Sequence, residues 1–300
     1  MNFSNARTHH HSDYQRRHIE LNNHVKISIA AIDLLYSSCK TKEALTEKLS
    51  QLIVDAGERW TRTILKDPHL EITRTRRQIS EMAIVRVYSS FNVFTDEISG
   101  SYNEYKNVGA TSGATPVEKI YNSFGWSMSN ISYLLPVLNF YQIARHCIAH
   151  QMGSPNAEVD SILSDPAFQA AISSWPTVNP TRSLSAAPKV SNGLIYLSPH
   201  HSITYSDVCL RVVRDIDRRL IRELGTSHFA RKIGDRDVIK MEEPRDLRQR
   251  DVYRYIRSKL DVEFGIRDMS ILEVRETLGG DDQCKKYFRK YEKLRSMKKV

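Results

Sequence analysis

Apolar residues recur at helical spacing over most of the first 225 residues, and this pattern is the strongest constraint on the fold. The apolar residues recur densely enough within each segment for a buried helix, and over 205–224 they are spaced by fours, which places them on one side of an α-helix. The segments cover residues 17–39, 41–56, 73–100, 116–148, 157–175 and 205–224. The chain has only 12 Gly and 10 Pro among its 300 residues, which disfavours a many-turned β architecture. We therefore expect an all-α protein.

The helix that starts near residue 116 has several agreeing start signals. Thr115 and Glu118 have the spacing of a capping box, and Pro116 suits the first helical turn. Gly125 or Pro136 should kink or divide this segment, because proline removes a backbone hydrogen bond inside a helix. Thr41 is a plausible N-cap for the segment that follows it.

The chain is expected to fall into three parts. Residues 193–204 should form a small β-hairpin or an extended strap before the helix over 205–224, and Gly225 stands where that helix should end. The predicted parts are a disordered, His-rich N-terminal tail over 1–16, a helical domain over 17–225 and a basic, mainly helical C-terminal region over 226–300.

Positive charge is concentrated near the C-terminus. Residues 245–300 hold 16 Lys or Arg and 10 Asp or Glu, so six of the nine excess positive charges of the chain lie there. The last helix interleaves aromatic residues with cations that could contact RNA phosphates: Lys285, Lys286, Arg289, Lys290 and Lys293. A solvated surface helix would have the same composition.

The sequence also predicts the cellular location of the protein. Its apolar runs are shorter than the roughly 20 residues of a membrane helix, and the N-terminus lacks the apolar core of a signal peptide. Four scattered cysteines without a CxxC pair argue against a disulfide framework and against a cysteine zinc site. We expect a cytoplasmic protein with no contact to a membrane.

The hexapeptide from Arg145 to His150 carries the clearest chemical signal. It ends the long apolar segment just before a Gly-Ser-Pro break, and His146 and His150 lie four residues apart on one helical face. Zinc-binding helices use that spacing, but the pattern lacks the glutamate base and a third ligand. We therefore predict no metal at this site, and a metal-dependent hydrolase remains a separate alternative.

A cation and an imidazole at this spacing suit phosphate chemistry. Arg145 and His150 are about 140° apart around a helix and roughly 7.5 Å apart along it, so they would flank a groove. A guanidinium can hold a phosphodiester oxygen through two hydrogen bonds, and an imidazole can accept or donate a proton. RNA supplies its own nucleophile in the 2′-hydroxyl. Such a site would need no metal and no cofactor.

These residues resemble the HEPN superfamily of ribonucleases. Its signature is an Arg, usually followed by a polar residue, and a His separated from the Arg by four to six residues, near the end of a long helix, as in Arg145, His146 and His150. The resemblance covers residues 17–225 and implies an antiparallel helical bundle. It also implies a homodimer in which two motif helices form one composite site. Beside the motif, Phe140, Tyr141 and Met152 could supply the contact surface or stack on bases.

Several HEPN families add an acidic or polar residue from an earlier helix. The comparable segment here runs from Ser89 to Phe94 and has Asn92 where those families have Glu. Asn92 could orient Arg145 or His150, or it could only border the core.

The resemblance implies a metal-independent endoribonuclease acting as a toxin or an anti-phage defence protein. His150 would act as base or acid, Arg145 would stabilise the phosphorane, and His146 would position the substrate or share proton transfer. The implied partners are RNA (tRNA, mRNA or rRNA), a second copy of the chain, and an antitoxin or phage-derived regulator.

Two alternatives remain open at this point. Arg145 could pair with a carboxylate while His150 satisfies the helix C-terminus, which would give the motif a structural role. The chain would then be a non-catalytic helical module that binds RNA or protein.

Overall fold

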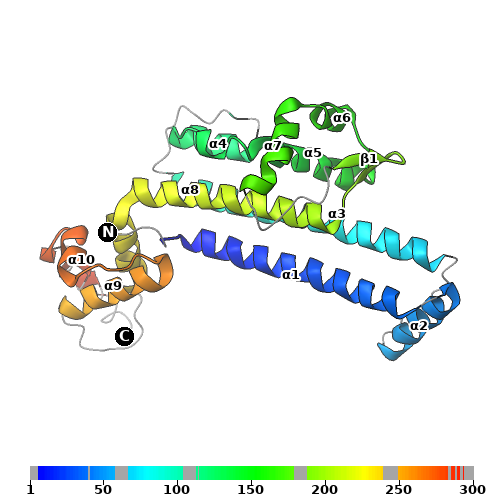
Figure 1. The fold of residues 1–300 in the computed structure, drawn as a ribbon. Helices are drawn as coiled ribbons and strands as arrows, with labels where there is room; N and C mark the ends of the chain where they lie inside the picture. Colours follow the sequence, from blue (N-terminus) through cyan, green and yellow to red (C-terminus); the bar gives the residue numbers. More distant parts are fainter. Residues whose placement is uncertain are drawn as a thin grey trace. The chain divides into compact units, whose positions relative to one another are not determined.

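The computed structural model describes residues 6–39, 41–57, 67–103, 113, 115–178, 188–238, 249–282, 285–287, 289–290 and 293. These residues form an all-α fold with a single two-stranded antiparallel sheet among them, as expected (Figure 1). The chain divides into two compact units. One comprises Tyr14–Val212, and the other joins Met1–Asp13 to Val213–Val300.

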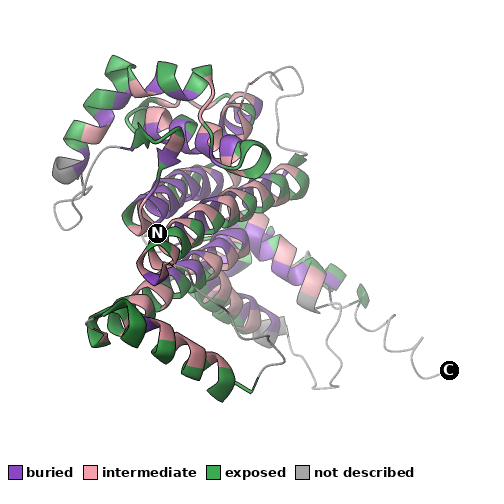
Figure 2. Ribbon diagram, turned by 90° about the vertical axis from the view of Figure 1, so that its right-hand side faces the viewer, coloured by how far each residue is buried: buried purple, intermediate pink, exposed green. Residues whose placement is uncertain are grey.

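The Tyr14–Val212 unit contains most of the helices. Its elements are α1 (His9–Ser38, from Tyr14), α2 (Lys42–Asp55), α3 (Pro68–Ser101), α4 (Pro116–Phe124), the 3-10 turn η2 (Ser129–Ile131), α5 (Leu135–Gln151), α6 (Ala157–Leu163), α7 (Pro166–Val178), β1 (Lys189–Ser191), β2 (Leu194–Tyr196) and the first part of α8 (Pro199–Ile233). Helix α3 packs against α4 and α5, and α5 packs against α6 and α7. The long helices carry a buried stripe and an exposed stripe (Figure 2).

Side-chain caps fix where several helices begin. Thr115 and Glu118 form the expected capping box of α4, and α4 ends at Gly125 in the left-handed conformation. Thr41 caps α2 by accepting a hydrogen bond from the Ala44 amide. The predicted division at Gly125 and the Thr41 cap are therefore confirmed.

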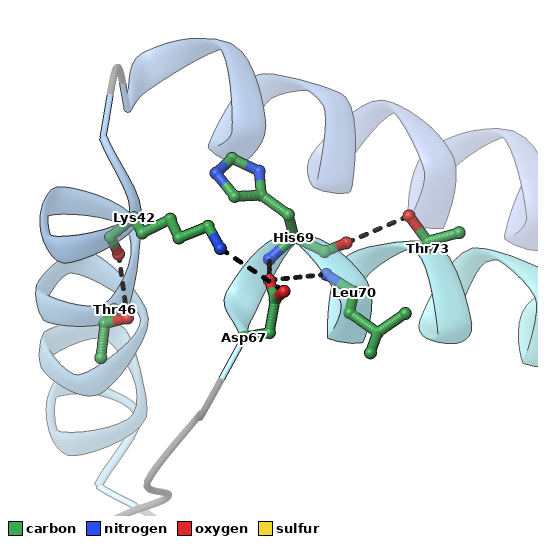
Figure 3. A network of polar contacts seen from close by, with 6 residues as sticks. All are labelled: Lys42, Thr46, Asp67, His69, Leu70 and Thr73. Atoms are coloured by element: carbon green, nitrogen blue, oxygen red, sulfur yellow. Dashed lines mark hydrogen bonds and ion pairs between the residues drawn. The ribbon is translucent and has the colours of Figure 1, made fainter.

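Helix α3 begins five residues before the predicted start at residue 73. Asp67 is its N-cap and accepts hydrogen bonds from the amides of His69 at 3.1 Å and Leu70 at 3.2 Å (Figure 3). Lys42 of α2 lies 3.5 Å from the same carboxylate, and these contacts lower the pKa of Asp67. The cap thus ties the start of α3 to α2.

The prediction of a disordered tail over residues 1–16 is wrong from Ala6 onward. Thr8 caps α1, because its Oγ1 accepts a hydrogen bond from the His11 amide. The Thr8 hydroxyl in turn donates to the buried carboxylate of Asp217 at 2.6 Å. Burial of Ala6 and these polar contacts anchor the segment in its unit, and Met1–Asn5 lie outside the described residues.

The β-hairpin lies earlier than the predicted strap over 193–204. Strand β1 pairs with β2 through Lys189 opposite Tyr196 and Ser191 opposite Leu194. Asn192 and Gly193 form the turn with φ of 54° and 71°, as a two-residue hairpin with positive φ requires. Residues 199–204 belong to α8 instead, since Pro199 starts that helix.

Gly225 ends the first of two helical stretches that make up α8. Its φ of 68° and ψ of 172° are not helical, in agreement with the predicted helix end, and a second helical stretch continues to Ile233. The unit boundary lies near Val213, inside the first stretch, so it differs from the predicted domain boundary at 225/226. A single glycine breaks helical geometry locally, but apolar residues beyond it, such as Phe229 and Ile233, are buried and keep the helix packed.

The second unit has its own hydrophobic core. It is formed by the rest of α8, a short π-helical turn (Gly234–Val238), α9 (Gln249–Phe264), α10 (Ile271–Leu278) and the described part of the last helix. Phe229, Ile256 and Phe264 are fully buried in this core, and Tyr287 joins it from the last helix. This packing fits the prediction that the C-terminal region is mainly helical.

Two further sequence expectations concern the cysteines and membrane-spanning helices. Cys39, Cys147 and Cys209 are free thiols, and Cys284 lies outside the residues whose side chains are described. Among the helices in the described part of the chain, none is long and apolar enough to cross a membrane.

Candidate functional site

The Arg145–His150 motif forms the last turns of α5, and left-handed backbone ends this helix. Pro136 occupies the first turn, where its missing N–H costs little. At the other end Met152 has a φ of 54° and Gly153 a φ of 85°. The amides of both residues donate to the carbonyl of Cys147. The motif therefore stands at a fixed helix end.

The two histidines of the motif lie next to each other and face solvent. The ring centroids of His146 and His150 are 4.8 Å apart, and both residues are exposed. Neither ring has a hydrogen bond to any described residue, whereas backbone amides satisfy the Cys147 carbonyl at the helix end. A capping role for His150 would require a hydrogen bond from its ring to the end of the helix, and the ring makes none among the described residues.

Arg145 lies against the neighbouring helix α3. Its guanidinium carbon is 4.1 Å from the centroid of the Tyr88 ring, a cation–π contact. The residue is half-buried, and its Nε has no acceptor among the described residues. Within that part of the chain Arg145 also has no carboxylate partner, so no ion pair occupies its charge.

Arg145 and the histidine pair lie on different sides of α5. Successive residues turn by about 100° in an α-helix, so His146 and His150 point about 100° and 140° away from Arg145. One chain thus presents an imidazole pair to solvent and a guanidinium along α3.

Asn92 is not brought to the histidines. Tyr88 of α3 contacts Arg145, and Glu81 of α3 lies beside Gly153 after α5, so the two helices run antiparallel. Asn92 is one turn beyond Tyr88 on α3 and therefore lies toward the start of α5, away from His150. Its Oδ1 is buried with no hydrogen-bond partner among the described residues, so it orients neither Arg145 nor His150.

Glu81 supplies an acidic group that the sequence prediction missed. A Cβ built on Gly153 would lie 3.3 Å from Glu81 Oε1, which puts the carboxylate beside the end of the motif helix. Arg77 forms an ion pair with it at 3.3 Å. Burial raises the pKa of Glu81 above its usual value, and the charge of Arg77 acts in the opposite direction. The signal in the sequence is a glutamate within the apolar stripe of α3, seven residues before Tyr88.

The surface beside the motif is smaller than the sequence suggested. Phe140 and Tyr141 are fully buried and cannot contact a partner or a base. Met152 is 86% exposed and remains available. The groups of His, Cys, Asp and Glu in the described chain include no cluster of three that could hold a metal ion.

The cations of the last helix are exposed, as an RNA-binding surface requires. Tyr287 is buried against Gly234 and docks the helix, while the cations face solvent: Lys285, Lys286, Arg289, Lys290 and Lys293. Lys285 lies 3.4 Å from Asp282 and Lys290 lies 3.7 Å from Asp235. Such exposed ion pairs are weak and leave these cations accessible to phosphate.

Comparisons of this chain with protein-family models, with curated proteins and with solved structures found no match.

Proposed function

We propose that this protein is a metal-independent endoribonuclease. The observation that carries the proposal is the solvent-facing pair of His146 and His150 at the end of the helix that also bears Arg145. Neither imidazole is used in a hydrogen bond, and the guanidinium is used in no ion pair, within the described structure. Side chains that the fold does not use in a hydrogen bond or an ion pair are available for a substrate.

The proposed reaction is a transesterification within the RNA strand. His150 removes the proton of the 2′-hydroxyl as this oxygen bonds to phosphorus, and the bond from phosphorus to the 5′-oxygen breaks. His146 returns a proton to the leaving 5′-oxygen. Arg145 stabilises the charge on the phosphorane oxygens. The products are a 2′,3′-cyclic phosphate and a 5′-hydroxyl end.

We propose that the working unit is a homodimer. In one chain Arg145 and the histidine pair point to different sides of α5, so a single copy encloses a phosphodiester poorly. A two-fold contact between motif helices brings the Arg145 of each copy toward the histidines of its partner. The exposed Met152 beside the motif supports this contact, because a side chain with that exposure gains from burial at an interface.

The basic last helix supports RNA as the substrate. Its exposed cations would add phosphate contacts whose strength falls with salt. The same observation favours a second candidate, a non-catalytic RNA-binding module. A ribonuclease of this kind would suit a toxin or anti-phage role in the cytoplasm, restrained by an antitoxin or a phage-derived regulator.

Cleavage of RNA in the presence of EDTA tests the proposal. Wild type should cut a mixed cellular RNA sample, and His150→Ala and Arg145→Ala should each lower the rate by about 10²-fold or more. Lys48→Gln on the exposed face of α2 is the control and should cut normally. Circular dichroism checks that the inactive variants fold. RNA binding without cleavage by wild type would instead establish the second candidate.

A further inference from the structure

A cavity of about 850 Å³ lies within the Tyr14–Val212 unit, apart from the histidine pair. Its walls come from α1, the first turns of α3, the β-hairpin and the beginning of α8. Leu70, in the first turn that Asp67 caps, and Thr73, in the next turn, line the cavity (Figure 3). This volume is in the range of small-molecule and cofactor sites.

The cavity joins an apolar wall to a cationic one. Aliphatic side chains from the hairpin and from α1 and α8 form the apolar wall, including Val25, Ile29, Ile195, Leu197 and Ile203. The cations come from α1 and α3: Lys26, Arg74, Arg76 and Arg77. Among the described residues that line the cavity Asp33 is the one carboxylate, and it is paired with Arg76.

The cations keep hydrogen-bond donors for a ligand even after their ion pairs are counted. Arg74 pairs with Glu71 at 2.6 Å, on the exposed surface where such pairs are weak. The Nε of Arg76 is buried and has no hydrogen-bond acceptor in the described structure, whereas the Nε of Arg77 lies 3.3 Å from Glu81 Oε1 without a hydrogen bond to it. Lys26 has no carboxylate partner there either. A buried N–H without an acceptor is costly, and an anionic ligand would satisfy it.

An aromatic ring stands at the edge of the same cavity. Tyr196 of β2 lines it and is 50% exposed, and Lys189 Nζ lies 5.8 Å from the centroid of its ring. A half-exposed ring offers a face for stacking a base, and the neighbouring cations suit a phosphate. We propose that this cavity binds a nucleotide, with its phosphate against the cationic wall of Lys26, Arg74, Arg76 and Arg77 and its base against Tyr196.

The cavity is connected to the end of the motif helix. The amide of Ile195, which lines the cavity, donates to the Gly153 carbonyl at 2.9 Å. From the other wall Arg77 contacts Glu81, which lies beside Gly153. A nucleotide of a bound RNA strand is therefore one source of the ligand, and this source rests on the proposed function. A free nucleotide is the other source.

Binding measurements with uncleavable probes test the site separately from the nuclease activity. The probes are AMP, a fluorescent 2′-O-methyl RNA hexamer and inorganic phosphate, measured by calorimetry or anisotropy. Wild type should bind AMP or the hexamer, and phosphate should bind at least tenfold more weakly. The double variant Lys26→Gln with Arg74→Gln should lose at least tenfold in affinity, and Tyr196→Ala should lose about threefold or more.

The matched control is Lys48→Gln with Lys119→Gln, which removes the same charge at exposed positions outside the cavity. Its affinity should stay within twofold of wild type. If AMP binds and the cavity variants weaken its binding, a free nucleotide is a sufficient ligand. If only the hexamer binds, the ligand is a nucleotide within an RNA strand. The proposal is overturned if wild type binds neither probe, if phosphate binds as well as AMP, or if the control loses as much affinity as the cavity variant. Because no probe can be cleaved, failure of the nuclease proposal would leave this result unchanged.

Discussion

The guanidinium of Arg145 lies over the ring of Tyr88, with 4.1 Å between the guanidinium carbon and the ring centroid. Stacking on a ring holds the plane of the guanidinium while leaving its N–H groups free to donate in that plane. Tyr88 therefore acts as a positioning residue for Arg145 in the proposed mechanism. Asn92, which the sequence suggested for this task, lies one helical turn away.

Replacing Tyr88 tests this positioning role. Tyr88→Leu removes the cation–π contact, which contributes about 0.5–2 kcal/mol, so kcat/KM for RNA cleavage should fall roughly twofold to thirtyfold. Tyr88→Phe keeps the ring face and should retain most activity. Equal losses in both variants would show that the hydroxyl, not the ring face, matters.

Met152 has a left-handed backbone conformation, which costs conformational free energy for any residue that carries a Cβ. Met152→Gly should therefore raise the free energy of unfolding by about 0.5–1 kcal/mol, because glycine tolerates the φ of 54°. Urea unfolding of the two proteins measures the difference. A decrease in stability would mean that the exposed methionine side chain contributes more than the strain costs.

Gly234 leaves room for the ring of Tyr287. A Cβ at residue 234 would lie 2.7 Å from Tyr287 Cζ, so Gly234→Ala must shift the Tyr287 ring or the backbone that holds it. We expect a loss of about 1–3 kcal/mol in the free energy of unfolding and weaker RNA binding. Gly100→Ala in α3 is the control, since nothing lies within 4 Å of its added Cβ. Comparable losses in both variants would contradict the close packing.

The buried carboxyl of Asp217 should make stability depend on pH. Burial raises its pKa to about 6 from 3.8, against the hydrogen bonds from Thr8. Between pH 4 and 6 the folded protein holds a proton on Asp217 that the unfolded chain has lost. The contribution of Asp217 to the free energy of unfolding therefore falls as pH rises through this range, by up to about 3 kcal/mol.

Asp217→Asn removes this dependence. Its stability relative to wild type should increase from pH 4.5 to pH 7.5, as measured by urea unfolding at each pH. His9 and His11, whose pKa values are lowered to about 4 mainly by burial, titrate in both proteins and cancel in the difference. A difference that stays constant with pH would show that Asp217 does not titrate in this range.

Local signals in the sequence predicted much of the helical fold. The Thr115 and Glu118 capping box and the stop at Gly125 depend on neighbouring residues alone, and the structure has them. Tertiary packing decided the remaining boundaries. Thr8 caps a helix because Asp217, more than 200 residues away, holds its hydroxyl. The hairpin at Asn192 and Gly193 was readable from the sequence, since that dipeptide favours the observed turn, but the prediction placed it too late.

The site was predictable in its motif but not in its surroundings. The spacing of His146 and His150 predicts their proximity, because residues four apart share a helical face. Which residues of α3 meet α5 depends on helix register, which periodicity along one helix does not determine. The contacts of Tyr88 with Arg145 and of Glu81 with the end of α5 therefore required the structure.

The most direct test of the proposed chemistry is the fate of an RNA oligonucleotide whose cleavage position in EDTA has been mapped. Wild type should leave a 2′,3′-cyclic phosphate on the 5′ fragment, detected by mass spectrometry, and a single 2′-deoxy substitution at the cleaved nucleotide should abolish cutting there. His150→Ala should yield no such fragment. Cleavage that survives the 2′-deoxy substitution, or that His150→Ala still carries out at the wild-type rate, would contradict the account.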